Sequence, residues 1–131
     1  MWKEAIICSI IIITILIGNQ VTQSYSVETV EEITIKLEEL KQEMNKEQEN
    51  INHEKINEKI EDIFNKWNER HDKLAYYIEH DELEKVETNL TSLKSYIKTN
   101  QYAEAVCELD KTVFILKHIE DKYVFNLQNV F

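Results

Sequence analysis

The segment from Ile78 to Ile97, IEHDELEKVETNLTSLKSYI, decides the fold class of this chain. Its strongly apolar residues are spaced three or four positions apart: Leu83, Val86, Leu90, Leu93 and Ile97. This spacing is typical of a helix that buries one face, whereas a half-buried strand alternates every two residues. We therefore predict an amphipathic helix over residues 82–98.

Three other segments carry apolar stripes with the same spacing. The first stripe is Val30, Ile33, Leu37, Leu40 and Met44. The second stripe is Ile56, Ile60, Ile63, Trp67, Leu74 and Ile78, widened by Phe64 and Tyr77. The last stripe is Val106, Leu109, Val113, Leu116 and Ile119. These stripes predict helices at about 27–49, 52–79 and 101–120.

Turn residues are scarce, because the 131 residues include one Gly and no Pro. Sheets depend on such residues, whereas helices joined by short connections need few and lie antiparallel to one another. We therefore expect an all-α fold: an N-terminal membrane anchor helix followed by an antiparallel up-down bundle of about four helices, or two helical hairpins. Asp81 and Glu84 have the spacing of a capping box at the start of a helix. The tail VFNLQNVF, residues 124–131, is expected to cover the bundle as an extended cap or short turn.

The N-terminal segment MWKEAIICSIIIITILIGNQV, residues 1–21, is the most apolar part of the chain. From Ala5 to Ile17 every residue is apolar or small, and eight of them are Ile. As a helix this run rises about 20 Å, and residues 1–21 rise about 31 Å, close to the roughly 30 Å hydrocarbon core of a bilayer. We expect residues 1–24 to be an N-terminal membrane anchor or signal segment, and residues 25–131 to be an extracytoplasmic helical bundle domain. A cleaved signal peptide and a buried core helix are the alternatives.

The charges around the apolar run indicate its orientation. Lys3 precedes the run, whereas the first charges after it are Glu28, Glu31 and Glu32. The positive-inside rule then favours an N-terminus inside the cytoplasm and a C-terminal domain outside the cytoplasmic membrane. Secretion after signal cleavage is the alternative. The net charge of −10 makes nucleic acid an unsuitable partner.

The two cysteines are far apart in the predicted fold. Cys8 lies in the apolar N-terminal segment and Cys107 in the last predicted helix, so we expect no disulfide between them. Cys107 is interpreted as a small core residue.

The chain after the apolar segment resembles a family of small bacterial proteins, the domain of unknown function 4363. The motifs that carry the resemblance are Trp67, the turn HDE at residues 80–82, the segment 78–97, the ending LKHIED at residues 116–121 and the tail at Asn129. The family often has a tryptophan about fourteen residues before the Trp67 position, and this chain has His53 there. The resemblance implies an anchored helical domain, and it brings no established activity.

Catalytic motifs are missing from the sequence. It contains no Gly-bearing nucleophile elbow, no phosphate-binding loop and no His-Glu-x-x-His pattern, so we expect neither an enzyme nor a cofactor. We expect Trp67 in the core, and Tyr76 and Tyr77 at the bundle edge. A groove flanked by the two tyrosines is the alternative.

One group of residues fits a metal site. If the last two helices are antiparallel, the start of one lies beside the end of the other, which gathers His80, Asp81, Glu84 and His118. Imidazole and carboxylate groups are ligands for zinc or a similar divalent ion. We favour the structural interpretation, in which Asp81 caps its helix and His118 interacts with the negative C-terminal end of its own helix, so that no metal site is expected.

The predicted bundle favours a non-enzymatic role as an interaction or scaffolding module of the bacterial envelope. The expected partners are the membrane, through the N-terminal segment, and either another envelope protein or a second copy of the chain. The alternative function is a metal- or ligand-binding sensor domain that uses His80, Asp81 and His118.

Overall fold

The computed structural model describes the backbone of residues 1–130, and the side chains of those residues apart from 19, 20, 22, 23 and 124–130. Within this part of the chain the elements are α1 Trp2–Met44, a short 3-10 helix Gln48–Asn50, α2 His53–Leu74, α3 His80–Lys98 and α4 Tyr102–Val130. No strand occurs within residues 1–130. The prediction of an all-α chain is confirmed.

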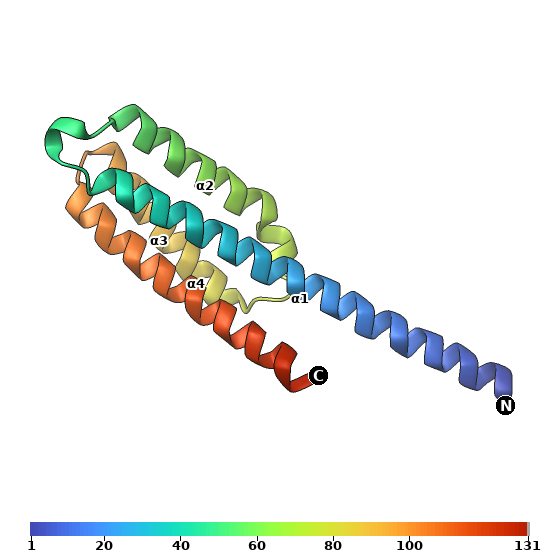
Figure 1. Cartoon of the computed structure of the whole chain (residues 1–131). Helices are drawn as coiled ribbons and strands as arrows, with labels where there is room; N and C mark the ends of the chain where they lie inside the picture. The colour runs from blue at the N-terminus through green and yellow to red at the C-terminus, as the bar shows by residue number, and fades with distance from the viewer. Residues whose placement is uncertain (131) are drawn as a thin grey trace.

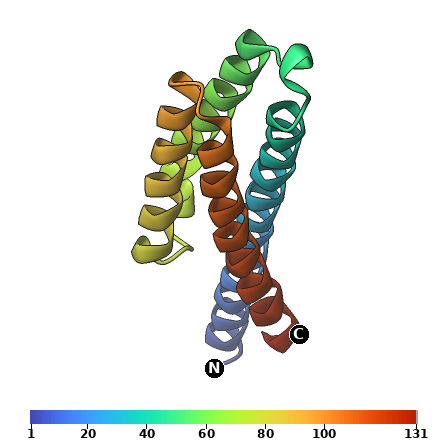
Figure 2. The same cartoon turned by 90° about the vertical axis from the view of Figure 1, so that its left-hand side faces the viewer.

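The C-terminal half of α1 packs with α2, α3 and α4 into a bundle, and consecutive helices run in opposite directions (Figure 1). Helix α1 contacts α2 and α4, and α3 also contacts α2 and α4. The N-terminal half of α1 projects beyond the bundle (Figure 1), and in Figure 2 the C-terminal end of α4 lies at the same end of the molecule as this segment. The α2–α3 turn lies at the end from which α1 emerges, and the α1–α2 and α3–α4 connections lie at the far end.

The core is one cluster of buried side chains contributed by all four α-helices. The residues of the four predicted stripes are at most 6% exposed, except Val106, Phe64 and Tyr77, which are half-buried. Trp67 is 1% exposed, as predicted. Each fully buried aliphatic side chain contributes about 1.5–3 kcal/mol relative to an exposed one, so the stripes supply most of the apolar driving force.

Three predicted helix boundaries are wrong. Helix α1 is continuous from the apolar segment into the bundle and ends at Met44 rather than 49, and α2 ends at Leu74 rather than 79. Helix α4 continues to Val130, so the expectation of an extended cap or short turn after residue 120 is also wrong. No Gly or Pro lies between 119 and 130 to end the helix. The packing of the tail side chains lies outside the described residues.

The predicted capping box at the start of α3 is wrong. The residue at the N-cap is Glu79, whose carbonyl oxygen accepts the backbone N–H groups of Glu82 and Leu83, each at 3.1 Å. Asp81 lies inside the first turn and makes no capping hydrogen bond. Its carboxylate is still well placed, because negative charge near a helix N-terminus is favourable.

The far end of the bundle is closed by two local arrangements. Asn100 has a φ of 58°, and its neighbours bond back to α3, with Gln101 N–H donating to the Tyr96 carbonyl at 2.9 Å. Asn tolerates this left-handed conformation, which commonly ends helices. Close by, the ring of His53 stacks on that of Tyr102 with centroids 5.5 Å apart, so His53 joins α2 to α4.

Ion pairs join α1 to α2. Lys36 Nζ lies 2.7 Å from Asp62 Oδ2, and Glu32 binds both Lys66 at 2.5 Å and Arg70 at 2.7 Å. The hydrogen bond from Lys66 lowers the pKa of Glu32. The hydrogen bond from Lys36 likewise lowers the pKa of Asp62. Both carboxylates are therefore stabilised in their charged form by the fold.

The α1–α4 contact has a different character. Lys41 Nζ binds Asp110 Oδ1 at 2.8 Å, but Glu31 and Glu120 bring two carboxyl groups together on the same pair of helices. Burial, followed by the hydrogen bond with Glu31, raises the pKa of Glu120. Like charges at this contact therefore oppose the apolar packing at neutral pH.

The interpretation of Cys107 as a core residue is wrong. Both Cys8 and Cys107 are free and exposed. Cys107 lies two residues after buried Ala105 and two before buried Leu109, which places it on the opposite side of α4.

Candidate functional site

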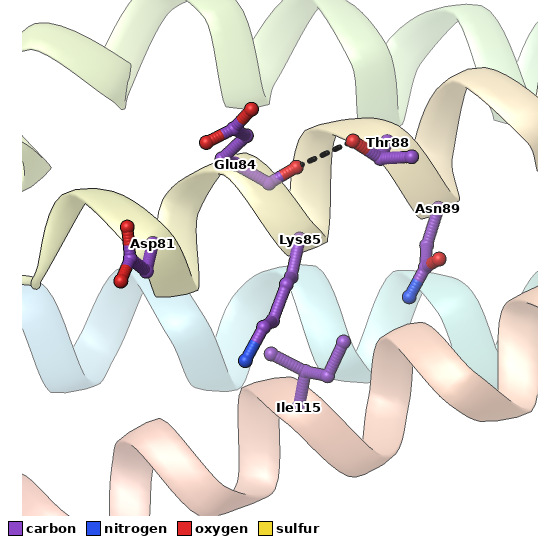
Figure 3. A pocket seen from close by; sticks show the side chains of 6 residues that line it. All are labelled: Asp81, Glu84, Lys85, Thr88, Asn89 and Ile115. Atoms are coloured by element: carbon purple, nitrogen blue, oxygen red, sulfur yellow. Dashed lines mark hydrogen bonds between the residues drawn. The ribbon is translucent and has the colours of Figure 1, made fainter.

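A groove runs along the first turns of α3 and faces α4. It has a volume of about 360 Å³ and is lined by Asp81, Glu84, Lys85, Thr88, Asn89 and Ile115. Figure 3 shows Lys85 extending toward Ile115 on α4, whereas the carboxylate of Glu84 points away from it. The Thr88 hydroxyl donates to the Glu84 carbonyl oxygen at 2.8 Å. The lining residues other than Ile115 are therefore polar, but they do not converge on one point.

The structure places the predicted histidines beside different groups. His80 is the first residue of α3 and is exposed, as is Asp81. The side chain of His118 on α4 is 67% exposed, and its Nε2 lies 3.9 Å from Glu82 Oε1. His118, in the second half of α4, does lie beside the start of α3, as expected, but the carboxylate 3.9 Å from its Nε2 belongs to Glu82 rather than to Asp81.

Glu82 is the residue of this end that the sequence reasoning missed. Its side chain is only 12% exposed, and Lys122 Nζ lies 3.8 Å from Oε1. Its other oxygen, Oε2, is buried without a hydrogen-bond partner among the described residues. Lys122 also binds Glu79 at 2.9 Å, and this hydrogen bond lowers the pKa of Glu79. The sequence signal that could have indicated the burial of Glu82 is its position directly before Leu83, a buried residue of the apolar stripe.

Within the part of the chain that the structure describes, no three His, Cys, Asp or Glu side chains are grouped so that they could hold a metal ion. The hypothesis of a zinc site at His80, Asp81 and His118 stays a prediction.

The apolar extension of α1 is the other candidate site. Its Ile and Leu side chains from Ile6 to Ile17 are 46–64% exposed. Successive residues of a helix are about 100° apart, so the four consecutive residues Ile10 to Ile13 face all sides of α1. A contiguous exposed apolar surface of this kind marks contact with a membrane or another protein. Over the described residues, none of the helices combines the length and the apolar character required to cross a bilayer.

The comparisons identify the family. A family model described as Domain of unknown function (DUF4363) matches residues 24–130, and the chain belongs to that family. The resemblance inferred from the sequence is confirmed, and the matched region begins after the apolar run of α1. No curated protein and no solved structure matches the chain.

Proposed function

We propose that the protein is a membrane-anchored, non-enzymatic interaction module. The apolar extension of α1 is embedded in lipid, and the helical bundle is presented outside the cytoplasmic membrane to another envelope protein or to a second copy of the chain. The observation that supports this proposal is the exposure of Ile10 to Ile13 on all sides of the projecting helix.

Lipid covers this surface better than a second copy does. A partner helix buries one stripe of α1 and leaves the opposite side in water, whereas acyl chains surround the helix. The run from Ala5 to Ile17 is shorter than the hydrocarbon core, so Trp2 on one side and Val21 on the other are assigned to the two interfaces. Interfaces of this kind favour aromatic side chains such as Trp2.

A matched pair of substitutions tests the insertion of α1 in lipid. Ile11 and Ile35 lie on the same helix and are 52% and 60% exposed, but only Ile11 belongs to the extension. A charge at the centre of a membrane helix costs about 2.5–3.5 kcal/mol, so Ile11→Asp should weaken flotation with phosphatidylcholine vesicles about 70- to 400-fold. Ile35→Asp should leave flotation unchanged. Equal flotation of the two variants, or concentration-dependent dimers without flotation, would refute the proposal.

The orientation is tested separately. A reporter that is active only outside the cytoplasm, fused after Phe131, should be active, and a cytoplasm-dependent reporter should be silent. The basis is Lys3 before the apolar run and Glu28 after it. The opposite pair of activities would reverse the orientation without affecting the insertion itself.

A further inference from the structure

A second groove lies at the base of the projecting segment, where α1 passes the α2–α3 turn. It has a volume of about 390 Å³, and its lining residues are Val21, Tyr25, Lys73, Tyr76 and Tyr77. Val21 is 66% exposed and Tyr76 is 82% exposed, so apolar and aromatic surface faces outward here. Lys73 Nζ lies 5.5 Å from the centre of the Tyr25 ring. Arg70 Cζ lies 5.9 Å from the same ring but does not line the groove, so Lys73 supplies the positive charge of the groove.

Lys73 differs from its basic neighbours on α2, whose positive charges are paired with a carboxylate. Lys66 and Arg70 both bind Glu32. Within the described side chains, no carboxylate lies within ion-pair distance of Lys73, whose contact is with the Tyr25 ring. The groove therefore offers a positive charge to an anion, although the whole chain has a net charge of −10.

The position of the groove along α1 matches the headgroup layer of a bilayer. Val21 lies four residues beyond Ile17, or about 6 Å along the helix, and Tyr25 lies about 12 Å beyond it. A bilayer is about 40–45 Å thick around a core of about 30 Å, so each headgroup layer is roughly 5–8 Å thick. With Val21 at the edge of the hydrocarbon, as assigned above, Tyr25 lies about 6 Å beyond that edge, so the groove lies within the headgroup layer. Tyr rings and Lys ammonium groups are the side chains that favour this depth.

We propose that this groove docks on the membrane surface and binds the phosphate of a phospholipid through Lys73, with the rings of Tyr76 and Tyr77 among the headgroups. The proposal rests on the insertion of α1 in lipid and adds a second contact between the bundle and the same bilayer. The lipid is favoured over a soluble anion because the groove is continuous with the apolar extension through Val21. The bundle would then be held in one orientation on the membrane.

The test uses the full chain in phosphatidylcholine vesicles, with Cys8 and Cys107 replaced by Ser. An environment-sensitive fluorophore is attached through Ala75→Cys, an exposed position beside Tyr76, or through Asn50→Cys, an exposed position at the far end. The label at 75 should show blue-shifted emission and be quenched by lipids that carry a quencher on the headgroup. The label at 50 should show neither effect.

Two further substitutions in the protein labelled at position 75 examine the groove. Lys73→Glu and Tyr76→Ser should each abolish the blue shift and the quenching, so that the label behaves like the one at position 50. Lys98→Glu makes the same change of charge on an exposed lysine at the far end of α3 and should have no effect. Equal helix content by circular dichroism establishes that the variants compared are folded.

Flotation of each labelled protein separates the two proposals. A chain that does not float with the vesicles overturns the insertion of α1, and the docking of the groove with it. A chain that floats but shows no difference between labels 75 and 50, or no response to Lys73→Glu, overturns only the docking. A label at 75 that is not quenched by headgroup quenchers in vesicles, but is blue-shifted at high protein concentration in lipid-free detergent, would assign the groove to a second copy and also overturn the docking.

Discussion

Removing the side chain of Trp67 should destabilise the bundle more than any change at its surface. Trp67 is 1% exposed within the cluster formed by all four helices. A buried aromatic side chain removes about 150–250 Å² from water, which at about 25 cal/mol per Å² corresponds to roughly 4–6 kcal/mol. Its Nε1 atom is buried without a hydrogen-bond partner among the described residues, and such a group costs about 1–3 kcal/mol. We therefore expect Trp67→Ala to cost about 3–5 kcal/mol, the usual range for this substitution.

The unpartnered N–H gives a second, sharper expectation. Trp67→Phe removes that group at the cost of a small cavity, worth about 1 kcal/mol, so the two effects nearly cancel. The expected change in the free energy of unfolding is about 1 kcal/mol or less in either direction. If Trp67→Phe instead costs as much as Trp67→Ala, the indole N–H is partnered in solution and this accounting is wrong.

Urea unfolding of a fragment that begins at Tyr25, followed by circular dichroism, measures these differences. The fragment retains all four stripes, so we expect it to be soluble and helical, and Trp67 is its single tryptophan. Tyr76→Ala serves as the control, because Tyr76 is 82% exposed and surface changes stay within about 0.5 kcal/mol. A loss below roughly 1 kcal/mol for Trp67→Ala would show that Trp67 is not packed in the core.

Three other predictions concern charged side chains. The raised pKa of Glu120 means that its charged form is disfavoured in the fold, so Glu120→Gln should stabilise the fragment at neutral pH by about 0.5 kcal/mol. That gain should disappear below the ordinary pKa of a glutamate, and urea unfolding that shows the same gain at both pH values would contradict the assignment. Asp81 acts through its charge and not as a cap, so Asp81→Asn and Asp81→Ala should lower the free energy of unfolding by a similar amount, about 0.3–1 kcal/mol. If Asp81→Asn leaves the stability unchanged while Asp81→Ala lowers it, the capping hypothesis is restored. Added zinc should leave the melting temperature unchanged, and a saturable increase that the His80→Ala/His118→Ala double variant lacks would establish the metal site.

The core was predicted well from the sequence, because the buried face of a helix requires apolar residues every three or four positions, and this spacing is visible in the sequence itself. Leu90 and Leu93 are spaced for one helix face, and both are fully buried. The first residue of α3 was harder to predict, because it is determined by tertiary packing and not by the local sequence. Ile78 follows the end of α2, yet it is 3% exposed, and its N–H donates to the Leu74 carbonyl at 2.9 Å. Because Ile78 is buried in the turn, the N-cap of α3 is Glu79. This is two residues before Asp81, which the local capping rules favoured as the N-cap.

The candidate site was predicted only in outline. Antiparallel packing required the C-terminal part of α4 to approach the start of α3, and His118 in the second half of α4 does so. The spacing of apolar residues does not give the rotation of a helix finely enough to choose between adjacent carboxylates, so Asp81 was expected where Glu82 lies. The hydrogen bond from the Tyr123 hydroxyl to the Tyr77 carbonyl oxygen also lies beyond such reasoning, because it depends on α4 continuing past residue 120.

Helix α1 lies between two contacts that respond to acid in opposite ways. The pKa values of Glu32 and Asp62 are lowered by their lysine partners on the α1–α2 contact, so the stability they contribute is present above the ordinary carboxyl pKa and is lost as the pH falls through the lowered values. The raised pKa of Glu120 has the reverse effect on the α1–α4 contact, where protonation relieves the repulsion from Glu31. Acid should therefore loosen α2 before α4, and amide hydrogen exchange along Lys66 and its neighbours should rise first. Earlier exchange in α4 would mean that apolar packing, and not these carboxylates, decides which helix separates.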